Sequence, residues 1–139
     1  MELLMSAFFE NDKGSCTITL EKGEKYVYKR KYIGNRMSRD KVASGTLKDM
    51  SKWFNNDFKR YSKEYKLVKL RTTFVQIYES RLEVRVPKDY RKYNPIKWTD
   101  CPFIKKVVVE DIDGFEEWNF PYSTYEELQG IKTFLRKIL

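Results

Sequence analysis

The sequence contains no histidine, and its two cysteines, Cys16 and Cys101, lie too far apart for a metal-binding motif. Without histidine the commonest general base is missing, and a mixed cysteine–histidine zinc site is excluded. No glycine-rich phosphate-binding loop occurs, and no serine or cysteine has an evident activating partner. We therefore predict that the protein is not an enzyme and needs no cofactor.

Long apolar runs are also absent, so we expect no membrane-spanning segment and no membrane partner. The first ten residues, MELLMSAFFE, carry Glu2 and Glu10 and lack the basic start of a signal peptide. Two reduced thiols in the cytoplasm are a better interpretation of the cysteines than a secreted disulfide. We expect an intracellular, cytoplasmic protein.

One acidic cluster near the C-terminus keeps a metal-dependent nuclease open as an alternative. It comprises Glu110, Asp111, Asp113, Glu116 and Glu117. Carboxylates of this kind can hold Mg²⁺. However, Asp113 falls in a predicted turn, and acidic residues at a hairpin tip are usually solvated. We regard this as the weakest functional hypothesis and expect no metal site.

The composition suits one compact domain: 139 residues, of which 41% are hydrophobic and 16% aromatic. The net charge of +8 is unevenly distributed. Residues 25–98 hold 21 basic and seven acidic side chains, whereas the segments before and after each carry a net charge of −3. Such asymmetry indicates a basic face and a polyanionic partner. A lysine-rich surface that only maintains solubility is the alternative.

Turn residues separate short extended runs in the first third of the chain. Alternation predicts strands over 3–10, 15–20, 25–33 and 36–43, arranged as a four-stranded meander. Thr46 and Asp49 then form a capping pair, and apolar residues recur at helical spacing to residue 65. This pattern predicts an amphipathic helix over 46–64, with Met50, Phe54 and Phe58 buried.

The second half repeats the order of strands followed by a helix. Strands are predicted over 68–78, 81–86, 104–110 and 115–120, with a hairpin turn at Asp113–Gly114. Within 68–78, Val68, Leu70, Phe74 and Tyr78 are expected on one face, and Lys69 and Arg71 on the other. A capping box of Ser123 with Glu126 precedes a second principal helix over 124–138. Its expected core stripe is Leu128, Ile131 and Leu135.

The predicted fold class is therefore α+β, with antiparallel sheet and two principal helices in one domain, 1–139. A duplication with halves 1–65 and 66–139 remains open. Three positions of the first helix match positions 78 residues later: Thr46 with Thr124, Met50 with Leu128, and Trp53 with Ile131. This element order resembles that of the Whirly family, although no motif is shared. The resemblance implies binding of single-stranded DNA across the sheets.

The run KYVYKRKYI, residues 25–33, places cations and aromatic rings on both faces of a strand. Only one face can be buried against a helix. Because the tyrosines Tyr26, Tyr28 and Tyr32 are bulkier, we expect them to face the core. Lys25, Lys29 and Lys31 would then lie on the outer face, joined by Arg36 and Arg39 of the next strand.

A second basic and aromatic segment follows, RVPKDYRKYNPIKW, residues 85–98. Pro87 and Pro95 disfavour regular structure, so an exposed loop is expected. Cations neutralise phosphates while rings stack on unpaired bases, which is the combination that single strands require. The candidate binding residues are Lys29, Lys31, Arg36, Arg39, Arg85, Lys88, Tyr90, Arg91, Lys92, Tyr93 and Trp98.

The leading functional hypothesis is thus a non-enzymatic protein that binds single-stranded DNA or RNA. Nineteen lysines against nine arginines favour phosphate contacts over base reading, so sequence specificity should be weak. The alternative is a small phage or mobile-element protein that binds and inhibits a host protein or nucleoprotein complex. A homodimer is compatible with either hypothesis.

Overall fold

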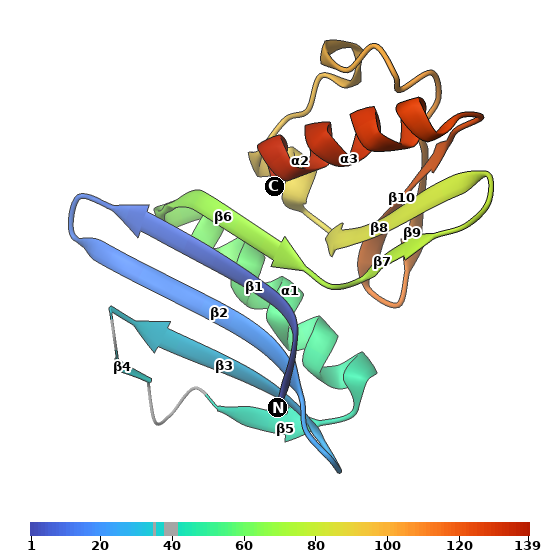
Figure 1. Cartoon of the computed structure of the whole chain (residues 1–139). Coiled ribbons are helices and arrows are strands. Elements are labelled where there is room, and N and C mark those ends of the chain that lie inside the picture. The colour runs from blue at the N-terminus through green and yellow to red at the C-terminus, as the bar shows by residue number, and fades with distance from the viewer. Residues whose placement is uncertain (35, 38–41) are drawn as a thin grey trace.

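A computed structural model of the whole chain describes residues 1–34, 36–37 and 42–139. Within these residues the fold is α+β, with two antiparallel sheets and three α-helices (Figure 1). The predicted fold class is confirmed. We call the six-stranded sheet, which is built mostly from the first half of the chain, sheet A and the four-stranded sheet B.

Sheet A follows the predicted meander and then gains one strand from further along the chain. Its order is β4-β3-β2-β1-β6, with β5 also paired to β3. The strands are β1 (Glu2–Asn11), β2 (Gly14–Lys22), β3 (Val27–Ile33), β4 (Arg36–Met37), β5 (Ala43–Gly45) and β6 (Lys66–Thr72). Of the expected fourth strand, 36–43, the structure describes β4 and the start of β5, which border β3 at its two ends; residues 38–41 lie outside the described residues. Arg39 lies outside the described residues.

Helix α1 (Leu47–Glu64) covers one face of sheet A, as Figure 1 shows. Its N-terminus is capped as expected, since the Thr46 hydroxyl accepts a hydrogen bond from the Asp49 amide at 3.1 Å. Met50, Phe54 and Phe58 are buried beneath the helix, which confirms the predicted stripe.

The expected single strand over 68–78 is instead divided between the two sheets. β6 pairs with β1, whereas β7 (Val75–Ile77) pairs with β8 (Arg81–Pro87). The chain is held at the change of direction, because the Thr73 amide and hydroxyl both donate to the Leu4 carbonyl at 2.9 Å. The pairing of β6 with β1 is irregular between Leu67 and Lys69, and Val68 has no partner on β1 there. Val68 is exposed while Leu70 is buried, so the shared apolar face was a wrong prediction.

Sheet B has the order β7-β8-β10-β9, with β9 (Val108–Ile112) and β10 (Phe115–Pro121) joined by the predicted turn. Asp113 and Gly114 both have positive φ there, as a tight hairpin turn requires. β9 begins four residues later than expected.

The final helix, α3 (Tyr125–Ile138), packs on sheet B and buries the predicted Leu128, Ile131 and Leu135. Its cap is Thr124, whose hydroxyl accepts from the Glu127 amide at 3.2 Å. The predicted Ser123–Glu126 capping box is therefore wrong by one position. Ser123 instead donates its amide to the Glu127 carboxylate at 3.2 Å.

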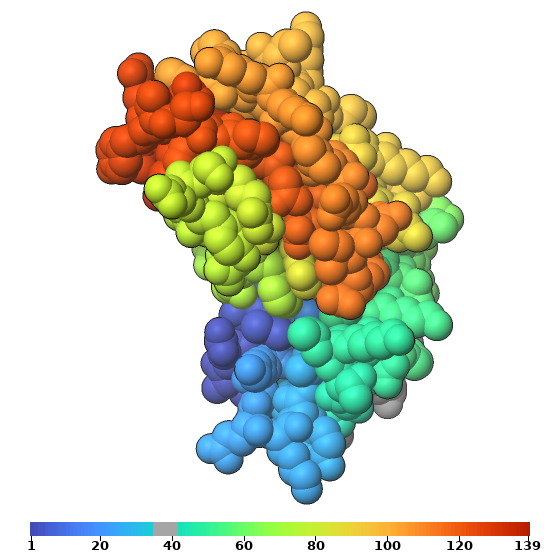
Figure 2. Space-filling model, turned by 90° about the vertical axis from the view of Figure 1, so that its right-hand side faces the viewer, coloured from blue at the N-terminus to red at the C-terminus, as the bar shows by residue number. Residues whose placement is uncertain are grey.

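A continuous series of aromatic rings joins the two sheets. Phe58 of α1 stacks with Tyr90 at 6.3 Å between centroids, and Tyr90 meets the edge of Trp118 in sheet B at 5.7 Å. Trp98 packs on Trp118 at 5.2 Å. Figure 2 shows the resulting contact between the first part of the chain, blue to teal, and the later part, yellow-green to red. Much of the aromatic content therefore serves one shared core.

Candidate nucleic-acid interface

The buried and outer faces of strand β3 are exchanged relative to the prediction from the sequence. Val27, Lys29 and Lys31 point toward α1 and are buried, with Lys29 only 4% and Lys31 only 7% exposed. Tyr28 and Tyr32 are on the other face and are half-buried. The prediction that Lys29 and Lys31 lie on an outer binding face is therefore wrong.

The physical reason is that α1 supplies partners for both lysines. The Lys29 ammonium forms an ion pair with Asp57 at 2.7 Å, and the Lys31 ammonium lies 4.6 Å from the centre of the Tyr61 ring. Asp57 and Tyr61 are four residues apart and so share one face of the helix. The aliphatic stems of the lysines fill the space that apolar residues would otherwise occupy.

The opposite face of sheet A is where rings and cations meet. In Figure 1 α1 lies behind this sheet, and no described helix covers β1, β2 and β3 from the front. Residues directly opposite one another in the register share a face. The register across β6, β1, β2 and β3 gives two rows on the uncovered face, Arg71–Ser6–Thr19–Arg30 and Lys69–Phe8–Thr17–Tyr32. We call these eight residues, together with Tyr28, the open face.

Small side chains at the centre of the open face leave its rings accessible. Ser6, Thr17 and Thr19 occupy the middle positions, so nothing bulky separates Phe8 on β1 from Tyr32 on β3. These two rings are two strands apart, which corresponds to about 10 Å. Both are half-buried and keep part of their surface for a ligand.

The cations of the open face differ in how firmly they are held. Arg30 donates to the Glu21 carboxylate at 2.7 Å and lies 5.1 Å from the centre of the Tyr28 ring. Lys69 and Arg71 are exposed, and within the described part of the chain neither has an acidic partner. These two side chains are therefore available to neutralise phosphates.

The segment 85–98 is not the free loop that the sequence predicted. It contains a short helix, α2 (Tyr90–Tyr93), and it packs over sheet B. Tyr90 is 2% exposed and donates its hydroxyl to the Ile138 carbonyl at 2.9 Å, and burial raises its pKa to about 12. Trp98 is half-buried against Trp118 and Phe120. Tyr90 is a core residue, so its expected exposure for base stacking is a wrong prediction, whereas Trp98 keeps part of its surface and its stacking role stays a prediction.

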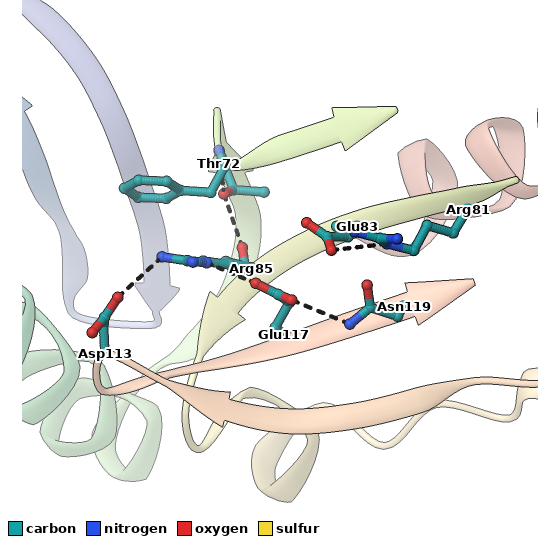
Figure 3. A network of polar contacts seen from close by, with 8 residues as sticks. Thr72, Arg81, Glu83, Arg85, Asp113, Glu117 and Asn119 are labelled. Carbon is teal, nitrogen blue, oxygen red and sulfur yellow. Dashed lines mark hydrogen bonds and ion pairs between the residues drawn. The ribbon is translucent and has the colours of Figure 1, made fainter. Parts of the chain in front are cut away.

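The arginines of this segment are held in ion pairs. Arg91 donates twice to Glu116, whose carboxylate also accepts from the Trp118 indole at 2.7 Å. The hydrogen bond to Glu116 raises the pKa of the Arg91 guanidinium further. Arg85 contacts Glu117 at 2.9 Å and Asp113 at 3.6 Å, as Figure 3 shows. The carboxylates neutralise both guanidinium charges, which weakens the attraction of either arginine for a phosphate.

Three of the remaining predicted residues lie near α2. Lys88 and Lys92 are exposed, and the Lys92 ammonium lies 5.6 Å from the ring centre of the half-buried Tyr93. Arg36 belongs to β4, at the far border of sheet A from β6. The structure therefore does not bring the predicted residues together into one surface.

The acidic cluster is also divided by the sheet. Glu116 and Glu117 point to opposite faces of β10, and each binds a different arginine. Among the described residues, no group of three ligating side chains is placed to hold a metal ion. In the same part of the chain, no helix is long and apolar enough to cross a membrane.

No protein-family model, curated protein or solved structure matches this chain. The resemblance to the Whirly family in element order therefore gains no support from known structures.

The residues predicted for binding from the sequence did not include Phe8, Lys69 and Arg71, which lie on the open face. The available signal was strand alternation in 66–72, which places Lys69 and Arg71 on the same face. What alternation could not show is that β6 returns to pair with β1 and brings those cations beside Phe8. Such a pairing joins residues about 60 positions apart in the sequence.

Proposed function

We propose that this protein is a non-enzymatic, cytoplasmic binder of single-stranded nucleic acid, and that the bound nucleic acid lies on the open face of sheet A. The observation that carries the proposal is the row Lys69–Phe8–Thr17–Tyr32, which alternates a free cation, a ring, a small residue and a second ring. Bases can stack on Phe8 and Tyr32 while Lys69 and Arg71 neutralise phosphates. The two buried free thiols, Cys16 and Cys101, are compatible with a reducing compartment.

A sheet face with accessible rings favours single strands over duplexes. In a duplex the bases are already stacked, and their edges are reached through grooves that a helix or a narrow β-ribbon enters. The open face offers ring surfaces with hydroxyl groups between them, and no projecting element from the described residues. We infer weak sequence specificity, because stacking accepts every base.

Fluorescence anisotropy with labelled single-stranded DNA, single-stranded RNA and duplex DNA, over a series of salt concentrations, tests this proposal. The double variant Lys69→Gln/Arg71→Gln should lower the slope of log affinity against log salt by about 1.4, since each phosphate contact contributes about 0.7 on single strands. The matched control is Lys52→Gln/Lys59→Gln, which removes the same charge from exposed positions of α1. It should leave the slope nearly unchanged.

Two results would overturn the proposal. Equal slopes for the open-face variant and its control would show that the charge effect is not local to this face. Failure of the unaltered protein to bind any nucleic acid at low salt would favour the alternative, in which a basic surface meets a host protein or a preassembled nucleoprotein.

A further inference from the structure

A groove opens where the free edge of β6 faces α3. Its volume is about 330 Å³, and four cations line it: Lys69 and Arg71 from β6, and Lys132 and Arg136 from α3. The floor is apolar and includes Leu70, Val84 and Leu135. Cations on both walls above an apolar floor can accommodate a nucleotide, with the phosphate at the rim and the base below.

The side chains that line the groove carry positive charge and no negative charge. No Asp or Glu side chain lines it, and none of its four cations has an ion pair there. Two of them, Arg136 and Lys132, stand four residues apart on one face of α3, so like charges are placed side by side. An anion bound between them would relieve this repulsion.

The groove and the open face share Lys69 and Arg71. These side chains lie in the two rows of the open face and also form one wall of the groove. In Figure 1 the C-terminal end of α3 lies above β6, at the border of sheet A opposite β3. Because the groove adjoins Lys69, a nucleic-acid strand that crosses the sheet from Tyr32 to Lys69 would continue into the groove.

We propose that the groove is a nucleotide-sized subsite that continues the path of the bound single strand beyond sheet A. This inference rests on the proposed function and adds the route and the footprint of the ligand. The volume is near the lower end of the range for small-molecule sites, about 300–1,000 Å³, which suits about one nucleotide. Lys132 and Arg136 hold its phosphate from the α3 side, opposite Lys69 and Arg71.

The test compares oligothymidines of about 4 and about 12 nucleotides, near the limits of known single-strand site sizes of about 4–16. The groove variant is Lys132→Gln/Arg136→Gln, and the matched control is Lys106→Gln/Lys137→Gln, which removes two exposed cations that do not line the groove. For the longer oligonucleotide the groove variant should reduce the salt slope by about 1.4. For the shorter one, which the open face alone accommodates, the slope should not change.

Each other outcome overturns the inference in a recognisable way. If the unaltered protein binds the longer oligonucleotide but the groove variant behaves like its control, the groove is not on the path and the proposed function stands. Equal losses of slope at both lengths would make the groove the primary site, contrary to a path that starts on the sheet. Absence of binding to either oligonucleotide by the unaltered protein would overturn the inference and the proposed function together.

Discussion

Replacing Lys29 by methionine distinguishes the observed orientation of β3 from the one that its sequence favoured. Methionine retains a flexible apolar side chain but removes the ammonium group that Asp57 binds at 2.7 Å. The Asp57 carboxylate would then be left largely buried, since its side chain is only 19% exposed. If Lys29 instead lay at the surface, the same substitution would have almost no effect on stability.

The magnitude follows from the cost of a buried charge that has lost its partner. Removing one member of a buried ion pair typically destabilises a protein by about 3–5 kcal/mol. Asp57 retains some contact with water, and the ammonium of Lys31 lies over Tyr61 on the same helical face, so both can compensate in part. We therefore expect the lower end of that range, about 3 kcal/mol.

Chemical denaturation of four proteins measures this effect: the unaltered chain, Lys29→Met, Asp57→Leu and the double variant. The double variant should be close to the unaltered protein in stability, because replacing both charges with apolar groups removes the desolvation penalty as well as the attraction. Lys25→Met, at an exposed position just before β3, is the matched control and should change stability by no more than about 0.5 kcal/mol.

One result would refute the reasoning. If Lys29→Met changed stability as little as Lys25→Met and instead lowered the salt slope of nucleic-acid binding, Lys29 would lie on the binding surface and the tyrosines of β3 would face the core. The orientation of β3 described above would then be wrong.

Three further outcomes are expected. Tyr32→Ala should weaken binding of single-stranded DNA by about 1–3 kcal/mol while the salt slope stays constant, since it removes a stacking ring and no charge; an unchanged affinity would contradict the stacking role. Phe58→Ala should cost about 3–5 kcal/mol in urea denaturation, because Phe58 is fully buried between Phe9 and Tyr90, and a cost below about 1 kcal/mol would place it at the surface. Burial raises the pKa of Tyr90 to about 12, whereas a tyrosine in the unfolded chain has a pKa near 10. Between these two pH values the folded protein keeps the Tyr90 proton and the unfolded chain loses it. Stability should therefore decline as the pH rises from about 10 to about 12, and Tyr90→Phe should make that decline shallower without abolishing it, because the pKa of Tyr61 is also raised to about 12.

The elements that were predicted well are those whose signals are local. Both principal helices were predicted within one residue at each end, since a capping threonine and a repeating apolar stripe stand close together in the sequence. The α3 cap was assigned to Ser123 instead of Thr124 because two adjacent hydroxyl residues each precede an acidic residue by three positions.

The candidate site was predicted poorly because it depends on contacts between distant segments. Bulk alone favoured the tyrosines of β3 as core residues, whereas the decisive feature was Asp57 on a helix that begins fourteen residues after the strand ends. In the same way, Tyr90 and Trp98 resemble stacking residues in the sequence, yet Phe58 of α1 packs on Tyr90, and Trp118 and Phe120 of β10 pack on Trp98.

Charge along the sequence is an incomplete guide to charge on the surface, and this chain shows why. The basic section 25–98 suggested the binding face, but Lys29, Arg85 and Arg91 within it are neutralised by acidic residues inside the protein. Two of the four cations that line the groove, Lys132 and Arg136, come instead from a section whose net charge is −3. Strand pairing and helix docking decide which cations remain free, so a surface of unpaired positive charge can combine residues from segments of opposite net charge. A polyanion-binding site is therefore better predicted from cations that lack an ion pair and lie on the same surface. By this criterion the open face and its groove are a better candidate site than the segment 85–98.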